Sequence, residues 1–92
     1  MQLTRDDLAG LTTLLAVADK RSFTAAAAAL CVTPSAVSQS VSAAEARVGV
    51  RLFARTTRRV SPTEAGARFL AELRPALEQV QAAFAVLEEA RG

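Results

Sequence analysis

The stretch from Leu30 to Gln39 constrains the fold more than any other part of the chain. Thr33 can cap a helix, because its hydroxyl can accept a hydrogen bond from an amide of the first helical turn. Pro34 suits the first helical position, since its missing N–H costs nothing there and its fixed φ matches a helix. These residues predict a short helix, a tight turn and a second helix that begins abruptly at Pro34.

This second helix is predicted to run from Pro34 to about Val48 and to end before Gly49, a residue that favours left-handed backbone. Its buried stripe is expected to contain Ala36, Val37, Val41, Ala44 and Val48. Its other side carries small hydroxyls and an amide, groups that fit against base edges and phosphates in the major groove of DNA. The residues of this side predicted to read DNA bases are Ser35, Ser38, Gln39 and Ser42.

The chain has 92 residues, no histidine and one cysteine. This length suits one small domain. Without histidine, the commonest general base and metal ligand is missing, and neither a glycine-rich phosphate loop nor a nucleophile–base pair is visible. We therefore expect no enzyme, no cofactor and no metal site.

The remaining composition favours a cytoplasmic protein. Cys31 cannot form an internal disulfide and is expected to be a small buried side chain in a reducing compartment. No apolar run is long enough to span a membrane, so we expect no membrane partner. Charged residues at positions 5–7 interrupt the N-terminus before the apolar core of a signal peptide could form.

Positive charge is concentrated in the middle of the chain. Residues 31–68 carry six arginines against two glutamates, whereas residues 1–30 are balanced and residues 69–92 are acidic. A basic segment between neutral and acidic ones favours local contact with a polyanion.

Two helices are predicted before the turn. The first runs from about Arg5 to Lys20 with Thr4 as its N-cap. Its apolar face is expected to contain Leu8, Leu11, Leu14, Leu15 and Ala18. The second begins at Ser22 or Thr24, ends at Leu30 and contains five consecutive alanines, which let neighbouring helices approach closely. Ser22 and Thr24 are interpreted as caps, with a phosphate contact at the same helix start as the functional alternative.

The segment Val50–Val60 has a shorter, strand-like pattern, which we interpret as a wing of two strands around a turn near Thr57. Arginine clusters are usually solvated, but a cluster directly after a candidate reading helix favours contact with phosphates or the minor groove. The residues predicted to contact phosphate are Ser22, Thr24, Arg55, Thr57, Arg58 and Arg59.

A long fourth helix is predicted to follow Pro62 and Thr63, which end the hairpin and cap the helix. Pro75 should bend this helix without ending it, since it removes one backbone hydrogen bond. The apolar residues alternate in steps of three and four, the heptad spacing of a coiled coil. We expect a second copy of the chain to cover this stripe, with folding back onto its own domain as the alternative. The predicted dimer interface is Leu70, Leu73, Leu77, Val80, Phe84 and Leu87.

The order and spacing of several motifs resemble the DNA-binding domain of LysR-type transcriptional regulators, from about Leu8 to Leu87. The motifs are Ser22-Phe23-Thr24 before Ala25 and Ala26; Val32-Thr33-Pro34-Ser35-Ala36-Val37-Ser38-Gln39; Glu45; Gly49-Val50-Arg51-Leu52-Phe53 with Arg55; Arg59-Val60; and Thr63-Glu64-Ala65-Gly66. The resemblance implies a winged helix-turn-helix followed by a dimerising linker helix, with Thr33 and Pro34 reading DNA together with Ser35, Ser38, Gln39 and Ser42. It also implies a larger C-terminal domain that binds a small-molecule inducer and is absent from this chain.

The sequence thus predicts a mainly α-helical fold, with a winged helix-turn-helix in residues 1–62 and a dimerisation helix in residues 63–92. The predicted function is sequence-specific binding of double-stranded DNA by a homodimer that reads an inverted repeat. The alternatives are a winged-helix domain of another regulator family and a purely helical dimerisation module that binds no nucleic acid.

Overall fold

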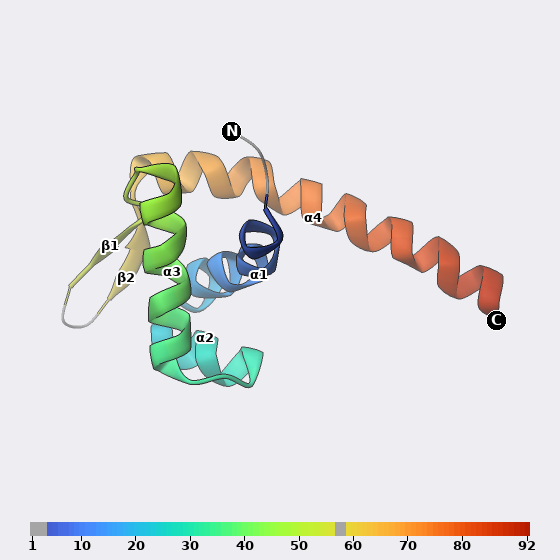
Figure 1. The fold of residues 1–92 in the computed structure, drawn as a ribbon, viewed down its shortest axis with the longest axis horizontal. Coiled ribbons are helices and arrows are strands. Elements are labelled where there is room, and N and C mark those ends of the chain that lie inside the picture. The colour runs from blue at the N-terminus through green and yellow to red at the C-terminus, as the bar shows by residue number, and fades with distance from the viewer. Residues whose placement is uncertain (1–3, 57–58) are drawn as a thin grey trace.

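The computed structural model describes residues 4–56 and 59–92. The elements follow in the order α1 (Arg5–Lys20), α2 (Phe23–Leu30), α3 (Pro34–Val48), β1 (Phe53–Arg55), β2 (Val60–Pro62) and α4 (Glu64–Arg91). Helices α1, α2 and α3 pack against one another, and the hairpin projects beside α3 (Figure 1). Helix α4 passes over this unit and then extends away from it. The predicted mainly helical, winged fold is confirmed.

Each of these helices begins at a hydroxyl side chain that replaces a missing backbone partner. The capping hydroxyls of Thr4, Ser22, Thr33 and Thr63 accept hydrogen bonds from Asp7 N, Ala25 N, Ala36 N and Gly66 N at 3.0–3.1 Å. In α1 the bond is reciprocated, because the Thr4 amide donates to the Asp7 carboxylate at 3.0 Å. The predicted helix starts are therefore confirmed together with their cause.

The first three helices end on residues in the left-handed region. Gly49 has φ +74° and ends α3 as predicted, while Arg21 and Cys31 adopt φ 55° and 59° at the ends of α1 and α2. Cys31 lies in the tight turn between α2 and α3, where its side chain is exposed. The prediction of a buried Cys31 was wrong, because the turn holds this residue at the surface.

The core draws on every helix and on the start of β1. Its buried members are Leu14, Val17, Ala26, Ala27, Val37, Val41, Leu52, Phe53, Leu70 and Leu73. Ala26 and Ala27 are fully buried, which lets α2 approach its neighbours closely, as predicted. Within the predicted apolar faces, Leu8, Ala36 and Val48 are exposed instead, because they lie at the margins of their stripes.

The wing is a short antiparallel ribbon. Phe53 pairs with Pro62, Ala54 with Ser61 and Arg55 with Val60. The second strand therefore reaches Pro62, two residues beyond the predicted end at Val60. Pro62 is tolerated there because it is the last residue of an edge strand. The predicted turn residue Thr57 lies outside the described residues.

Helix α4 begins against the wing and the core. Leu70 and Leu73 are buried there, and the Arg74 guanidinium bonds both oxygens of Asp19 in α1, at 2.6 and 3.4 Å. Pro75 lies inside the helix without ending it, as predicted, and α4 changes direction part of the way along (Figure 1). The first part of α4 thus belongs to the domain, whereas its C-terminal part lies outside the core.

Candidate nucleic-acid interface

The polar face of α3 is the central feature of the candidate interface. Ser35, Gln39 and Ser42 are exposed and Ser38 is half-buried. These positions are three or four residues apart and therefore share one side of the helix. Val37 and Val41 on the opposite side are 1% and 0% exposed, so they fix the rotation of α3 and keep the polar face outward.

The start of α3 is held rigidly. The amides of Cys31 and Val32 donate to Ala28 O and Ala27 O at 3.3 and 3.0 Å, which closes the turn after α2. Thr33 and Pro34 are both exposed at the first turn of α3. The first turn therefore has a fixed backbone and an open surface, and it continues directly into the polar face.

The start of α2 supplies a second candidate contact. Ser22 is half-buried and its hydroxyl caps α2, which confirms the capping interpretation for Ser22 but not for Thr24. Thr24 is exposed in the first turn of the same helix. Since helix N-termini readily bind anions, this position remains suited to a phosphate.

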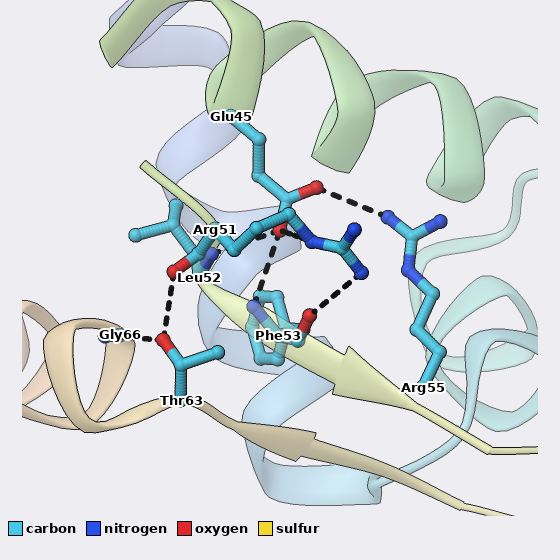
Figure 2. Close-up of polar contacts among 7 residues, drawn as sticks. All are labelled: Glu45, Arg51, Leu52, Phe53, Arg55, Thr63 and Gly66. Atoms are coloured by element: carbon cyan, nitrogen blue, oxygen red, sulfur yellow. Dashed lines mark hydrogen bonds and ion pairs between the residues drawn. The ribbon is translucent and has the colours of Figure 1, made fainter. Parts of the chain in front are cut away.

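Glu45 of α3 attaches the wing to the helices (Figure 2). Its Oε2 accepts from the amides of Leu52 and Phe53 at 2.8 and 3.2 Å, and its Oε1 accepts from Arg55 Nη2 at 3.2 Å. Arg51 Nε lies 3.7 Å from the same carboxylate. A side chain that is only 10% exposed thus satisfies two backbone donors and pairs with two arginines.

Sequence reasoning named Glu45 only as part of a motif and assigned it no role. The available signal was one acidic residue at the start of a strongly basic segment, six and ten positions before Arg51 and Arg55. An isolated carboxylate among arginines is a natural partner for them.

The predicted wing contacts differ in their surroundings. Arg55 is tied to Glu45, and its Cζ lies 5.0 Å from the ring centroid of Phe23. Arg59 is exposed, and its backbone bonds to Thr56 across the end of the ribbon. Thr57 and Arg58 lie outside the described residues.

The predicted dimer stripe divides into two parts. Leu70 and Leu73 are 7% and 9% exposed within their own domain, and Leu77 packs against the same core. Assigning Leu70 and Leu73 to an uncovered stripe was therefore wrong, because α1, β2 and the core already cover this part of α4. Val80, Phe84 and Leu87 are 50%, 63% and 63% exposed.

In residues 4–56 and 59–92, no group of three or more His, Cys, Asp or Glu side chains could hold a metal ion. Over the same ranges, no helix combines the length and apolar character needed to cross a membrane.

Comparisons with known proteins agree with this geometry. The family model described as bacterial regulatory helix-turn-helix protein, lysR family, matches residues 8–67. The HTH-type transcriptional regulator PgrR of Escherichia coli (strain K12) is 47% identical over 85 residues, which cover 92% of this chain and 28% of that protein. The chain thus spans little more than a quarter of the length of this curated relative.

Solved structures of other regulators share the fold, among them two DNA complexes. A crystal structure of the BenM DNA-binding domain with benA site 1 DNA matches with a TM-score of 0.84 and 27% identity, over 92% of this chain and 96% of that one. The crystal structure of the CbnR DNA-binding domain–DNA complex matches with a TM-score of 0.80 and 31% identity, over 91% and 97%.

Proposed function

We propose that this chain, which belongs to the lysR family of bacterial regulatory helix-turn-helix proteins, binds duplex DNA as the DNA-binding domain of a transcriptional regulator. The observation that carries this proposal is the exposed polar face of α3, which follows a rigid cap and lies beside a basic wing. Such a helix fits the major groove. This function belongs to the bacterial cytoplasm, where the DNA is.

Within the groove, we assign base reading to α3. Gln39 presents a paired donor and acceptor, which match the N6 and N7 edge of adenine. Thr33, Pro34, Ser35, Ser38 and Ser42 surround it on the same face or at the helix start. Small side chains let the helix approach base edges and phosphates closely.

Phosphate contacts are assigned to the flanks of α3. Ser22 and Thr24 lie at the N-terminus of α2, where the helix dipole favours an anion. On the wing, Arg59 is exposed, and the sequence adds Thr57 and Arg58 next to it. These contacts would position α3 without themselves reading sequence.

We propose that the domain acts as a homodimer through the C-terminal part of α4. Val80, Phe84 and Leu87 lie three or four residues apart and are at least half exposed. Covering each of them would contribute about 1.5–3 kcal/mol. A two-fold partner covers the same stripe on both copies and presents two copies of α3 to an inverted repeat. The purely helical alternative lacks support, since the chain carries the β1–β2 wing.

Binding to a pool of random duplexes, measured at several salt concentrations, tests the function. We expect affinity to fall steeply with salt, and Arg59→Ala to reduce the log–log slope by about one. Arg5→Ala is the matched control, because Arg5 is also exposed but lies at the start of α1. This end of α1 lies beside the C-terminal end of α3, where Arg47 pairs with Asp7. Absence of duplex binding at low salt would refute the proposal.

A further inference from the structure

One arginine connects the wing to both helices of the helix-turn-helix. Arg55 is the last residue of β1, and its guanidinium lies 3.2 Å from Glu45 of α3 and 5.0 Å from the ring centroid of Phe23 in α2. A guanidinium binds a carboxylate through its edge and an aromatic ring through its face. The Arg55 side chain, which is 31% exposed, is thus engaged in both ways.

The wing needs such an anchor. Its strands are three residues long each, and an isolated two-stranded ribbon of this size is marginally stable in water. Glu45 holds the start of β1 through the amides of Leu52 and Phe53, and Arg55 holds its end. Both ends of β1 are therefore fixed to the same carboxylate of α3 (Figure 2).

The position of Arg55 also determines that of Arg59, because Thr56 links the two residues. Thr56 N donates to Arg59 O at 2.8 Å, and Arg59 N donates to the Thr56 hydroxyl at 3.0 Å. Arg59 is therefore hydrogen-bonded to the residue that directly follows β1. Fixing Arg55 fixes the place from which Arg59 reaches outward.

We propose that Arg55 is a positioning residue, which sets the wing against α2 and α3 through Phe23 and Glu45 and so presents Arg59 to DNA. This inference rests on the proposed DNA-binding function. The inference replaces the prediction that Arg55 contacts a phosphate, because the edge and the face of the Arg55 guanidinium both have partners within the protein. A wing fixed before binding loses less conformational freedom on the DNA.

Replacing Glu45 distinguishes a positioning role from a purely electrostatic effect, because the two predict opposite changes in the affinity for DNA. Removing a carboxylate beside a DNA-binding surface takes away a repulsive charge, which by itself raises affinity. If Glu45 positions the wing, Glu45→Gln should instead lower the affinity for duplex DNA, because Gln cannot form the charged pair with Arg55.

The decisive experiment combines dynamics of the free protein with a double-mutant cycle. In Arg55→Met we expect lower ¹⁵N heteronuclear NOE values at Thr56 and Arg59, with those of α3 unchanged. We expect Arg59→Ala to weaken DNA binding about fivefold in the wild type and less than about twofold in Arg55→Met. Arg51→Met is the matched control. Arg51 pairs with the same carboxylate, but it reaches only the first residue of β1, where its Nη2 donates to Phe53 O at 3.4 Å, so its replacement should change neither result.

The inference would be overturned if Arg59→Ala weakened DNA binding equally in the wild type and in Arg55→Met and the NOE values were unchanged. Arg55 would then again be a candidate phosphate contact. Phe23→Leu provides the same two readouts with every charge retained, should Arg55→Met fail to fold. A wild-type chain that binds no duplex would refute the proposed function. The NOE values would then still decide whether Arg55 holds the wing.

Discussion

Gly66 of α4 lies so close to Leu52 that a Cβ at position 66 would stand 1.9 Å from the Leu52 carbonyl oxygen. That oxygen also accepts the Thr63 amide at 2.9 Å, and the Thr63 hydroxyl donates to Arg51 O at 2.7 Å (Figure 2). The backbone before β1 therefore packs directly against the first turn of α4, and two hydrogen bonds hold it there. Only glycine permits this approach.

We therefore predict that Gly66→Ala lowers the free energy of unfolding by about 3 kcal/mol or more, since relief of the clash must separate α4 from the segment before β1. Gly10→Ala is the matched control. A Cβ there would meet Ser40 Oγ at 3.5 Å, an ordinary contact, so the helix should gain about 0.5–1 kcal/mol. Urea unfolding of both variants measures the difference. Equal effects would show that the close approach is not maintained in solution.

The second prediction concerns acid stability. The Thr4 amide, which donates to the Asp7 carboxylate, is the main reason that the pKa of Asp7 lies below its ordinary value. The Thr4 hydroxyl and Arg47 act in the same direction, whereas removal from solvent opposes them. Because the folded pKa is lowered, Asp7 contributes stability that is present above the unfolded pKa, about 3.8, and is lost as pH falls through the folded value.

We expect Asp7→Asn to be less stable than the wild type at pH 6, with the difference shrinking as pH falls below about 3.8. Urea unfolding of both proteins from pH 6 to pH 2.5 measures this. A difference that stays constant over the whole range would mean that the Asp7 charge does not stabilise the start of α1.

The third prediction concerns assembly. Phe84→Asp should convert the proposed dimer to a monomer while leaving the domain folded, because Phe84 is 63% exposed and lies outside the core. Val86→Asp is the matched control, since Val86 is 62% exposed but lies on the other side of α4. Leu77 is less suitable, because it packs against the core and its replacement would also destabilise the domain.

Sedimentation equilibrium at tens of micromolar separates these outcomes. A monomeric wild-type chain, or equal dissociation of both variants, would argue against an interface on the Phe84 side of α4. Affinity for duplexes carrying one or two half-sites adds a second readout. Phe84→Asp should weaken binding to two half-sites far more than to one, since the link between the two reading helices is lost.

The fourth prediction concerns sequence reading. Gln39→Ala should cost about 1–3 kcal/mol at one base position and little at the others, because an amide pairs with one base edge. Gln79→Ala, the same change at an exposed position of α4, should leave every sequence unaffected. Binding to a set of single-base variants of a selected duplex measures both. A uniform loss across the set would make Gln39 a backbone contact.

Local signals predicted the elements well. Hydroxyl caps and left-handed ends are encoded within a few residues, so the bounds of α3 followed from Thr33, Pro34 and Gly49 alone. The heptad pattern of α4 was less decisive. Leu70 and Phe84 have the same periodicity, yet one is buried in its own domain and the other is exposed, because spacing does not identify the surface that covers a stripe.

The bonds between Glu45 and the backbone could not be predicted for a related reason. Its partners Leu52 and Phe53 are backbone amides seven and eight residues away, and a backbone amide has no sequence signature. The exposure of Cys31 likewise depends on a turn whose geometry follows from the packing of α2 against α3. Tertiary contacts of this kind cannot be predicted from a local pattern in the sequence.

Helix α4 continues beyond Pro75 for about 24 Å, at 1.5 Å per residue, and this part carries the exposed stripe. A change of about 10° in the bend at Pro75 would move the far end by about 4 Å, close to the 3.4 Å that separates successive base pairs. In the proposed dimer, the partner is attached to this far end. In that dimer, the bend at one proline would set the half-site spacing that the two reading helices can span, and a change of about one base pair in an operator would correspond to a small flexing of α4.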